Sequence, residues 1–495
     1  MSASVHFRSN FLREVLTKNA QTIRQVFREI SQETDEASQS RMAALLLGHR
    51  WFIESQIDEL EATLSREYCQ KLVRAEGHAN AGEPRIYRVI SGTLGCVAST
   101  AFGPQALGKL LTTPALAELF KPERLGETLT LAELWAIPPV VKLVLIEIIS
   151  RTVSSSHLDS ARCELEVLSA IECLHSLGRI RWSALIESIS VVHQILARDP
   201  SGVYLKMEFQ SRDMYRHAVE DLAADCGCDE ESVAHLARIL AEEAFRACGD
   251  ERKSHVGYYL IGPGTSHLRQ RGQLRPSWPV RLRELALRVP NLIYIGGTVA
   301  LTAAGTTALY RLLSPLSPWW LALLWLPMSQ IALWTMNFIV SRALPPQSLP
   351  RLDFSNGIPE EHRTFVVIPT LLLSRAGVER LLERLEVHYL ANRDRNLVFA
   401  LLTDFADSAE PLPGDDPLLG YCMRGIRRLN LRYAADDRSP FYLFHRMQRW
   451  NENHGVWMGR ERKRGKLEDF NRLLLGEEDS FEVKVGDLCV LPSTR

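Results

Sequence analysis

The sequence predicts a mainly α-helical N-terminal region over residues 1–288, a two-helix transmembrane hairpin over residues 289–345 and a partial α/β domain of the Rossmann type over residues 351–495. Three observations support this division. Apolar residues recur at helical spacing before residue 288, two long uncharged runs follow, and strand, helix and strand alternate after residue 351. A chain of 495 residues has room for about two to four domains, each with its own core.

The composition excludes some classes of partner and site. A formal net charge of -1 and a pI near 6.9 give no overall attraction to nucleic acid, so we expect no nucleic-acid partner. The nine cysteines are scattered and odd in number, which is typical of reduced thiols. Cys226 and Cys228 have no second cysteine pair or nearby histidines, so they match no structural zinc site.

The N-terminal region carries a helical pattern. Apolar positions recur at helical spacing over residues 168–197 and again over residues 233–247, and alternating β-branched runs are scarce. We therefore expect a helical array with few strands. Prolines and glycines predict breaks between its helices, at residues 77–84, 138–139, 199–202 and 262–264. Residues 89–108 are uncharged but rich in glycine and serine, which predicts a buried or irregular helix rather than a membrane span.

Two uncharged runs, residues 291–310 and residues 319–340, predict the hairpin. Each has about 20 residues, which is enough to cross a hydrocarbon core of roughly 30 Å. The alternative is a buried helical hairpin of a soluble domain. Residues 1–20 have no continuous apolar segment, so no cleaved signal peptide is expected. Arginines concentrate outside the two runs, and the positive-inside rule then places both long flanks, and both termini, in the cytoplasm.

After the hairpin, the pattern changes to that of a parallel sheet. Short apolar, β-branched runs predict strands, and amphipathic runs between them predict helices. The strands are expected at residues 365–368, 397–403 and 441–444, and the helices at residues 374–389 and 418–432. Ser374 is a plausible N-cap of the first helix. Repeated strand–helix–strand order favours right-handed crossovers between parallel strands.

Candidate ligand-binding residues follow from this sheet. Ligands of such sheets lie beyond the carboxyl ends of the strands, where we expect Pro369, Thr370 and Asp404. The Asp404 carboxylate can accept hydrogen bonds from a base or from ribose hydroxyls; the alternative is that it caps the next turn. Lys466 follows a basic run and Gly465, so it can offset the charge of a diphosphate. The alternative is a solvated, basic helix start, with Asn471 on the same helix.

An acidic metal-binding pair does not follow these elements. Transfer from a nucleoside-diphosphate sugar usually needs a divalent cation on the diphosphate, held by an Asp-x-Asp motif at a strand end. No strand ending in such a motif is expected after Asn471, and Asp404 and Asp407 have the wrong spacing on an earlier strand. We therefore assign no catalytic residue and no metal ligand.

Several longer strings carry a family resemblance. They are residues 131–139 (LAELWAIPP), 198–204 (RDPSGVY), 211–220 (SRDMYRHAVE), 255–260 (HVGYYL), 386–394 (EVHYLANRD), 449–451 (RWN) and 455–466 (GVWMGRERKRGK). In these strings the chain resembles the cyclic β-1,2-glucan synthases, glycosyltransferases of the bacterial inner membrane. The resemblance covers most of the chain from about residue 80 onward.

The resemblance implies a function and a location. It implies a GT-A-like nucleotide-sugar domain, UDP-glucose as donor, β-1,2-glucan as product, the lipid bilayer of the inner (plasma) membrane as partner, and Asp404 and Lys466 in the donor-binding half of the domain. A divalent cation, Mg²⁺ or Mn²⁺, is expected for the complete family enzyme and none for this chain alone. The tyrosine that primes the glucan is not assigned.

We therefore expect the N-terminal portion of a membrane glycosyltransferase that is inactive alone, because its Asp-x-Asp motif is missing. The alternatives are a non-catalytic membrane scaffold, a split-enzyme partner or a remnant. A polypeptide that completes the transferase domain is a further expected partner. A third interpretation, a helical adaptor anchored by two spans, requires the α/β pattern to be accidental.

Overall fold

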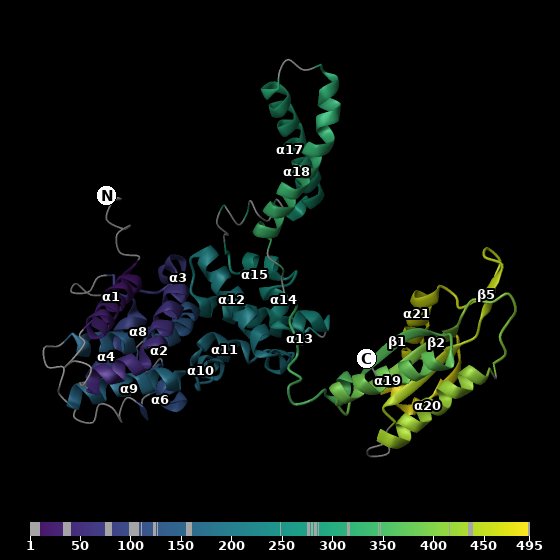
Figure 1. The fold of residues 1–495 in the computed structure, drawn as a ribbon, viewed down its shortest axis with the longest axis horizontal. Coiled ribbons are helices and arrows are strands. Elements are labelled where there is room, and N and C mark those ends of the chain that lie inside the picture. The colour runs from purple at the N-terminus through teal and green to yellow at the C-terminus, as the bar shows by residue number, and fades with distance from the viewer. Residues whose placement is uncertain are drawn as a thin grey trace. The chain divides into compact units, whose positions relative to one another are not determined.

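The computed structural model describes residues 10–493 except 33–40, 75–81, 99–107, 110, 122–124, 126, 155–160, 248, 275–277, 279–280, 282–284, 286, 314–316, 345, 347, 415 and 434–438. The chain divides into two compact units, Met1–Arg351 and Leu352–Arg495. The first contains the N-terminal helices and the hairpin, and the second contains the sheet and the helices that cover it (Figure 1).

The first half of the helical unit packs around one central helix, α8 (Leu131–Val153). Its neighbours are α1 (Phe11–Gln32), α2 (Arg41–Thr63), α4 (Arg85–Ala98) and α9 (Ala161–Leu177). In α1, the buried residues follow helical spacing, with Leu12, Leu16, Ala20, Ile23 and Phe27 on one face. By contrast, α8 is apolar on nearly every side, as expected of a helix surrounded by others.

Helix α8 runs without interruption through Pro138 and Pro139, so the predicted break at residues 138–139 is wrong. Proline inside a helix removes a backbone donor and crowds the preceding turn, which costs about 3 kcal/mol. Burial offsets this cost, because Ile137, Val140 and most other apolar side chains of α8 are almost completely buried, and each such side chain contributes about 1.5–3 kcal/mol. Tertiary packing therefore overrides the local signal.

The second half of the helical unit consists of shorter helices. They are α10 (Trp182–Ile189), α11 (Val191–Leu196), α12 (Phe209–Cys226), α13 (Glu230–Arg246), α14 (Val256–Leu260) and α15 (Thr265–Arg271). Gly227, at φ 67°, ends α12, and the Asp229 side chain accepts from the backbone N–H of Ser232 to begin α13. The prediction of a largely helical N-terminal region is confirmed for the described residues.

Helices α17 (Pro290–Leu312) and α18 (Trp319–Ala343) form the hairpin. Side chains of α18 fill the space that two glycines of α17 leave: a Cβ on Gly297 would lie 2.4 Å from Met336 Cε, and a Cβ on Gly305 would lie 2.4 Å from Met328 Cε. The Tyr294 hydroxyl donates to Asn337 Oδ1 at 2.7 Å. Both helices are long and apolar enough to cross a membrane by length and composition, and only 11% of the apolar window of each is buried. Residues 89–98 belong to α4, and residues 99–107 lie outside the described part of the chain.

The sheet unit contains four strands in the order β1-β2-β3-β6. They are β1 (Thr364–Leu372), β2 (Leu397–Phe405), β3 (Phe441–Arg446) and β6 (Phe481–Val485). The first three are parallel, as predicted, whereas β6 is antiparallel to β3, so the sheet is mixed. The sequence pattern does not predict β6. A short antiparallel ribbon, β4 (Arg449–Asn451) and β5 (Val456–Met458), follows β3.

Helices cover both faces of this sheet. Helices α19 (Arg375–Ala391) and α20 (Pro417–Tyr433) pack on one face, against Phe399 and Leu401, and α21 (Arg462–Leu474) packs on the other, against Ala400 and Leu402. This alternation along β2 is the side-chain period of a buried strand. Ser374 is the N-cap of α19, as predicted, and accepts from the backbone N–H of Gly377 at 3.2 Å.

Candidate functional site

Asp404 lies near the carboxyl end of β2 and is 1% exposed. Arg446, the last residue of β3, binds it with two hydrogen bonds, from Nε to Oδ1 at 2.9 Å and from Nη2 to Oδ2 at 2.9 Å. This bidentate geometry is the strongest arrangement of an arginine and a carboxylate. Among the described residues, no backbone N–H donates to this carboxylate, so the alternative that Asp404 caps a turn does not hold.

Lys466, in the first turns of α21, completes the surroundings of Asp404. Its Nζ lies 3.2 Å from Asp404 Oδ2 and donates to the backbone carbonyl oxygen of Thr370. Burial lowers the pKa of Lys466, and the nearby Asp404 charge opposes that shift. Lys466 is 2% exposed, so it is not part of a solvated helix start, whereas Arg464 has a side chain that is 85% exposed.

The structure thus brings together Thr370, Asp404 and Lys466, three of the four predicted site residues. Pro369 and Thr370 lie inside β1, paired with Leu402 and Thr403 of β2, so the prediction that they follow the end of that strand is wrong. The strand continues to Leu372 because β1 pairs on one edge only among the described residues, and an edge strand tolerates the missing donor of a proline.

A second carboxylate joins the cluster from α21. Arg446 Nη1 donates to Asp469 Oδ2 at 2.8 Å, and the Ser480 hydroxyl donates to the same oxygen. Burial opposes ionisation of Asp469, but these hydrogen bonds hold the pKa of its carboxyl below the usual value. We call the set of Asp404, Arg446, Lys466 and Asp469 the sheet-end cluster. The sequence interpretation misses Arg446 and Asp469, although a polar pair directly after the apolar run of β3 is a usable signal.

Two glycines allow this close packing. A Cβ on Gly459 would lie 2.4 Å from Asp404 Oδ2, and a Cβ on Gly465 would lie 2.2 Å from the carbonyl oxygen of Arg460. Neither distance is tolerated by a side chain. Gly465 therefore lets the loop before α21 fold over the helix start, while its predicted approach to a phosphate stays a prediction.

His445 stands beside the cluster on β3 but is completely buried. Its Nδ1 lies 2.8 Å from Thr403 Oγ1, and its ring packs edge-on against Phe405. Burial lowers the pKa of His445 to about 4, and the nearby Asp404 charge opposes this shift. The imidazole is therefore neutral at pH 7 and serves to join β2 to β3.

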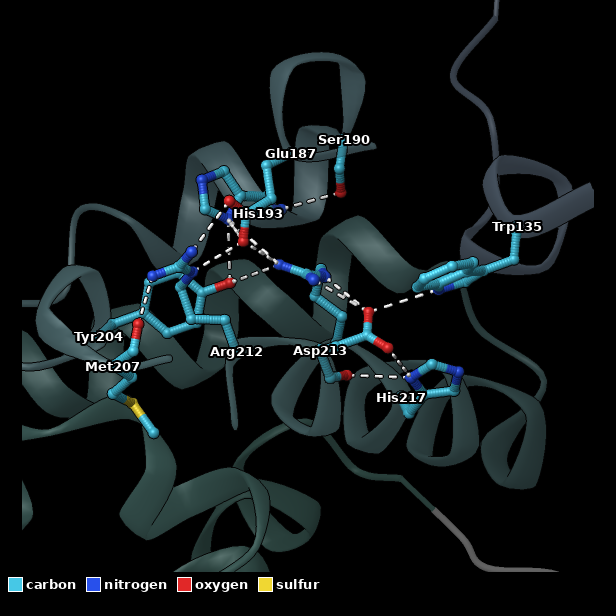
Figure 2. A network of polar contacts seen from close by, with 10 residues as sticks. Trp135, Glu187, Ser190, His193, Tyr204, Met207, Arg212, Asp213 and His217 are labelled. Carbon is cyan, nitrogen blue, oxygen red and sulfur yellow. Dashed lines mark hydrogen bonds and ion pairs between the residues drawn. The ribbon is translucent and has the colours of Figure 1, made fainter. Parts of the chain in front are cut away.

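The helical unit holds a second buried ionic network, centred on Arg216 of α12. Figure 2 shows Glu187, Arg212, Asp213 and Trp135 of this network. Arg216 is 0% exposed and donates to Glu187 at 3.1 Å and to Asp213 at 2.9 Å. Arg212 binds Glu187 through two further hydrogen bonds, at 2.7 and 3.0 Å. Trp135 Nε1 donates to Asp213 at 3.3 Å, so the network connects α8 to α12.

A hydrogen-bonded chain continues from this region. His255 Nδ1 lies 2.8 Å from Asp199 Oδ2, and the Tyr215 hydroxyl lies 2.9 Å from His255 Nε2. Burial raises the pKa of Tyr215 to about 12, so its hydroxyl stays protonated. A Cβ on Gly257 would lie 2.2 Å from that hydroxyl, so a residue with a side chain would not fit at this position. Three of the family-like strings, at residues 198–204, 211–220 and 255–260, therefore meet in one buried polar core.

Comparison with known proteins agrees with these motifs. No protein-family model matches the chain. Over 320 residues, or 63% of its length, the chain is 36% identical to the cyclic beta-(1,2)-glucan synthase NdvB of Rhizobium meliloti (strain 1021), and it covers 11% of that relative. The resemblance found in the sequence is confirmed: over these residues, the chain is related to the cyclic β-(1,2)-glucan synthases.

Proposed function

We propose that the chain is part of a glucan-synthase-like glycosyltransferase and that its sheet-end cluster binds the nucleotide portion of UDP-glucose. The similarity to a glucan synthase supports the class of enzyme. The observation that carries the site is the buried Asp404 carboxylate, held between Arg446 and Lys466 at the carboxyl end of a parallel strand. Ligands of open parallel sheets bind at this edge.

The chemistry of the cluster suits this ligand. A carboxylate has about four acceptor positions, so Asp404 keeps capacity for a base N–H or a ribose hydroxyl besides its two cationic partners. Lys466 places one positive charge beside Thr370, where it can neutralise part of a diphosphate. These residues bind and orient the donor, and none of them is proposed to take part in bond making.

A divalent cation would neutralise the diphosphate and stabilise the leaving group in a complete enzyme of this kind. The described residues do not fit such an ion. Asp404 and Asp469 are both bound to Arg446, and the described part of the chain has no group of three or more His, Cys, Asp or Glu that could hold a metal. We therefore propose donor binding without transfer. Release of UDP from UDP-glucose by the purified chain would overturn the proposal that no transfer takes place.

The hairpin is proposed to anchor the chain in a bacterial inner membrane. Exposed apolar side chains cover α17 and α18; Arg288 precedes α17, and Arg342 lies in the last turn of α18. By the positive-inside rule, we propose that both flanks lie in the cytoplasm, where nucleotide sugars are available. Labelling of a cysteine introduced at Ser317, in the link, tests the orientation: a membrane-impermeant reagent should reach it only from the periplasmic side.

A non-catalytic scaffold or split-enzyme partner is the second candidate, and the free edge of β1 favours it. Among the described residues β1 pairs only with β2, and Leu371 and Leu373 at its end are 42% and 68% exposed. An open edge of this length accepts a further strand. If another polypeptide supplies it, amides of β1 exchange more slowly in native membranes than in the purified chain; equal exchange contradicts this candidate.

Calorimetry with UDP-glucose on the detergent-purified chain tests the proposed site. Asp404→Ala and Lys466→Ala should each weaken binding at least about tenfold, because each removes a charge beside the ligand. Asp407→Ala and Lys463→Ala are matched controls, since both side chains lie nearby but outside the cluster, and they should change the affinity less than about twofold. The titration is repeated with and without Mg²⁺. No binding by folded chain, or equal losses in the controls, contradicts the proposal.

A further inference from the structure

A small polar cavity of about 190 Å³ opens beside the sheet-end cluster, beyond the end of β3. Four arginines line it, and they come from four places in the fold: Arg446 at the end of β3, Arg449 in β4, Arg460 before α21 and Arg472 in α21. Asp469, Glu478, Asp479 and Ser480 line the rest, together with Met447. The lining is therefore almost entirely charged or hydrogen-bonding.

One wall of this cavity is fixed by the protein itself. Arg446 is 2% exposed and is bound to both Asp404 and Asp469, and Ser480 donates to Asp469. Lys484 neutralises Asp479 at 2.7 Å. Groups that are already paired reorganise little when a ligand arrives, so this wall is preorganised.

The other wall carries two arginines that are not neutralised. Among the described residues, neither Arg449 nor Arg460 has a carboxylate within the 4.0 Å of an ion pair, while Arg472 is paired with Glu468 at 3.1 Å. The lining as a whole has four arginines against three carboxylates, and two of those carboxylates, Asp469 and Asp479, are already paired with cations. The local potential therefore favours an anion over a cation.

We propose that this cavity is an oxyanion site for a phosphoryl group, with Arg449 and Arg460 as its free donors. Arginine binds phosphate through paired N–H groups, and among the described residues those of Arg449 and Arg460 are not used in an ion pair. Its volume is below the roughly 300 Å³ of small-molecule sites, which suits a phosphate or diphosphate better than a whole nucleotide sugar. This inference goes beyond nucleotide recognition by Asp404 and does not depend on it.

The probe is inorganic pyrophosphate, titrated by calorimetry into the detergent-purified full chain in the presence of EDTA. Arg449→Ala and Arg460→Ala should each weaken its binding about tenfold, and the double variant about a hundredfold. Arg464→Ala is the matched control, because Arg464 starts the same helix but lies outside the cavity. It should change the affinity less than about twofold, the effect of a distant exposed charge. All three side chains are exposed, so the variants are expected to fold, as a thermal melt of each confirms.

Three outcomes overturn the site: no binding of pyrophosphate, unchanged binding in both cavity variants, or an equal loss in Arg464→Ala, which would indicate only a general basic field. Competition distinguishes the sources of the phosphoryl group. If pyrophosphate displaces UDP-glucose, the diphosphate of the donor occupies the cavity; if both bind together, it takes a free phosphate compound. Asp404→Ala separates the two proposals, because it should weaken UDP-glucose binding at least about tenfold and leave pyrophosphate binding in place, since Asp469 still holds Arg446.

Discussion

Arg216 in the helical unit and Arg446 in the sheet unit have similar ion-pair partners but lie in different kinds of place in the fold. Each is almost completely buried, at 0% and 2% exposure, and each is held by two carboxylates. Around Arg216, the hydroxyl of Tyr204 and the indole of Trp135 close the network between packed helices. Around Arg446, the cluster lies at the open end of a parallel sheet, beside a cavity with two unpaired arginines.

The comparison indicates that a buried ion pair alone does not identify a binding site. Both networks satisfy their charges internally, and both contain residues from family-like strings. The helical unit has a cleft of about 950 Å³, and Arg216, Glu187 and Asp213 do not line it. A ligand in that cleft would therefore not contact these three residues. We therefore interpret the Arg216 network as a structural joint and the sheet-end cluster as a site.

Replacement of either arginine should cause a similar and large loss of stability. Arg216→Ala and Arg446→Ala each leave two largely buried carboxylates, at most 17% exposed, without their shared cation, which should lower the free energy of unfolding by about 3–5 kcal/mol. Hydrogen exchange during urea unfolding reports each unit separately, and each variant should destabilise its own unit. Arg464→Ala, at an exposed position, should change stability by less than about 0.5 kcal/mol. A loss below about 1 kcal/mol in either variant would show that its network is not the joint described here.

Affinity for UDP-glucose should be affected by a substitution in the sheet-end cluster but not by one in the Arg216 network. Asp404→Asn and Asp213→Asn each remove one charge from a buried arginine, but only the first removes it from the proposed donor site. We expect Asp404→Asn to weaken UDP-glucose binding at least about tenfold, or about 1.4 kcal/mol, and Asp213→Asn to leave it within twofold. Calorimetry at 25 °C measures both. Equal losses in the two variants would remove the distinction between site and joint.

A smaller change is expected in the pH dependence of the stability of the helical unit. Glu230 of α13 accepts a hydrogen bond from the backbone N–H of Leu131 at 3.0 Å, and burial raises its pKa from 4.5 to about 7. Because the folded pKa exceeds the unfolded one, the stability contributed by Glu230 is fully present below pH 4.5 and is lost as the pH rises through 7.

Glu230→Gln should therefore raise the Tm of the helical unit at pH 8, by about 2–4 °C for each kcal/mol recovered, and should lose this advantage at pH 5. Differential scanning calorimetry at both values measures the difference. Glu231→Gln, at the neighbouring position, is the control and should behave like the parent chain. An advantage that is equal at pH 5 and pH 8 would contradict a raised pKa.

Local patterns were sufficient to predict most elements. The hairpin, β1 to β3 and the helices between them follow from uncharged runs and from apolar periodicity, which act within a single segment. The place of Asp404 follows from one further rule, that ligand-binding side chains lie at the carboxyl ends of parallel strands. That rule does not account for Thr370, which lies inside β1, or for Lys466, which reaches Asp404 from α21.

The misses have physical causes of longer range. Arg446 reaches Asp404 across 42 residues of sequence, so the pairing depends on the register between β2 and β3. Strand β6 is short and antiparallel, and its sequence is only half apolar. The continuation of α8 through Pro138 depends on the helices packed around it. None of these can be read from one segment alone.

The most direct test of the central claim is hydrogen exchange of the full chain with and without saturating UDP-glucose. We predict slower exchange in the peptides that carry Thr370, Asp404 and the start of α21, and unchanged exchange around Arg216 and its partners in residues 187–217. Protection confined to the Arg216 network, or no protection at a concentration that saturates binding, would contradict the assignment of the sheet-end cluster as the donor site.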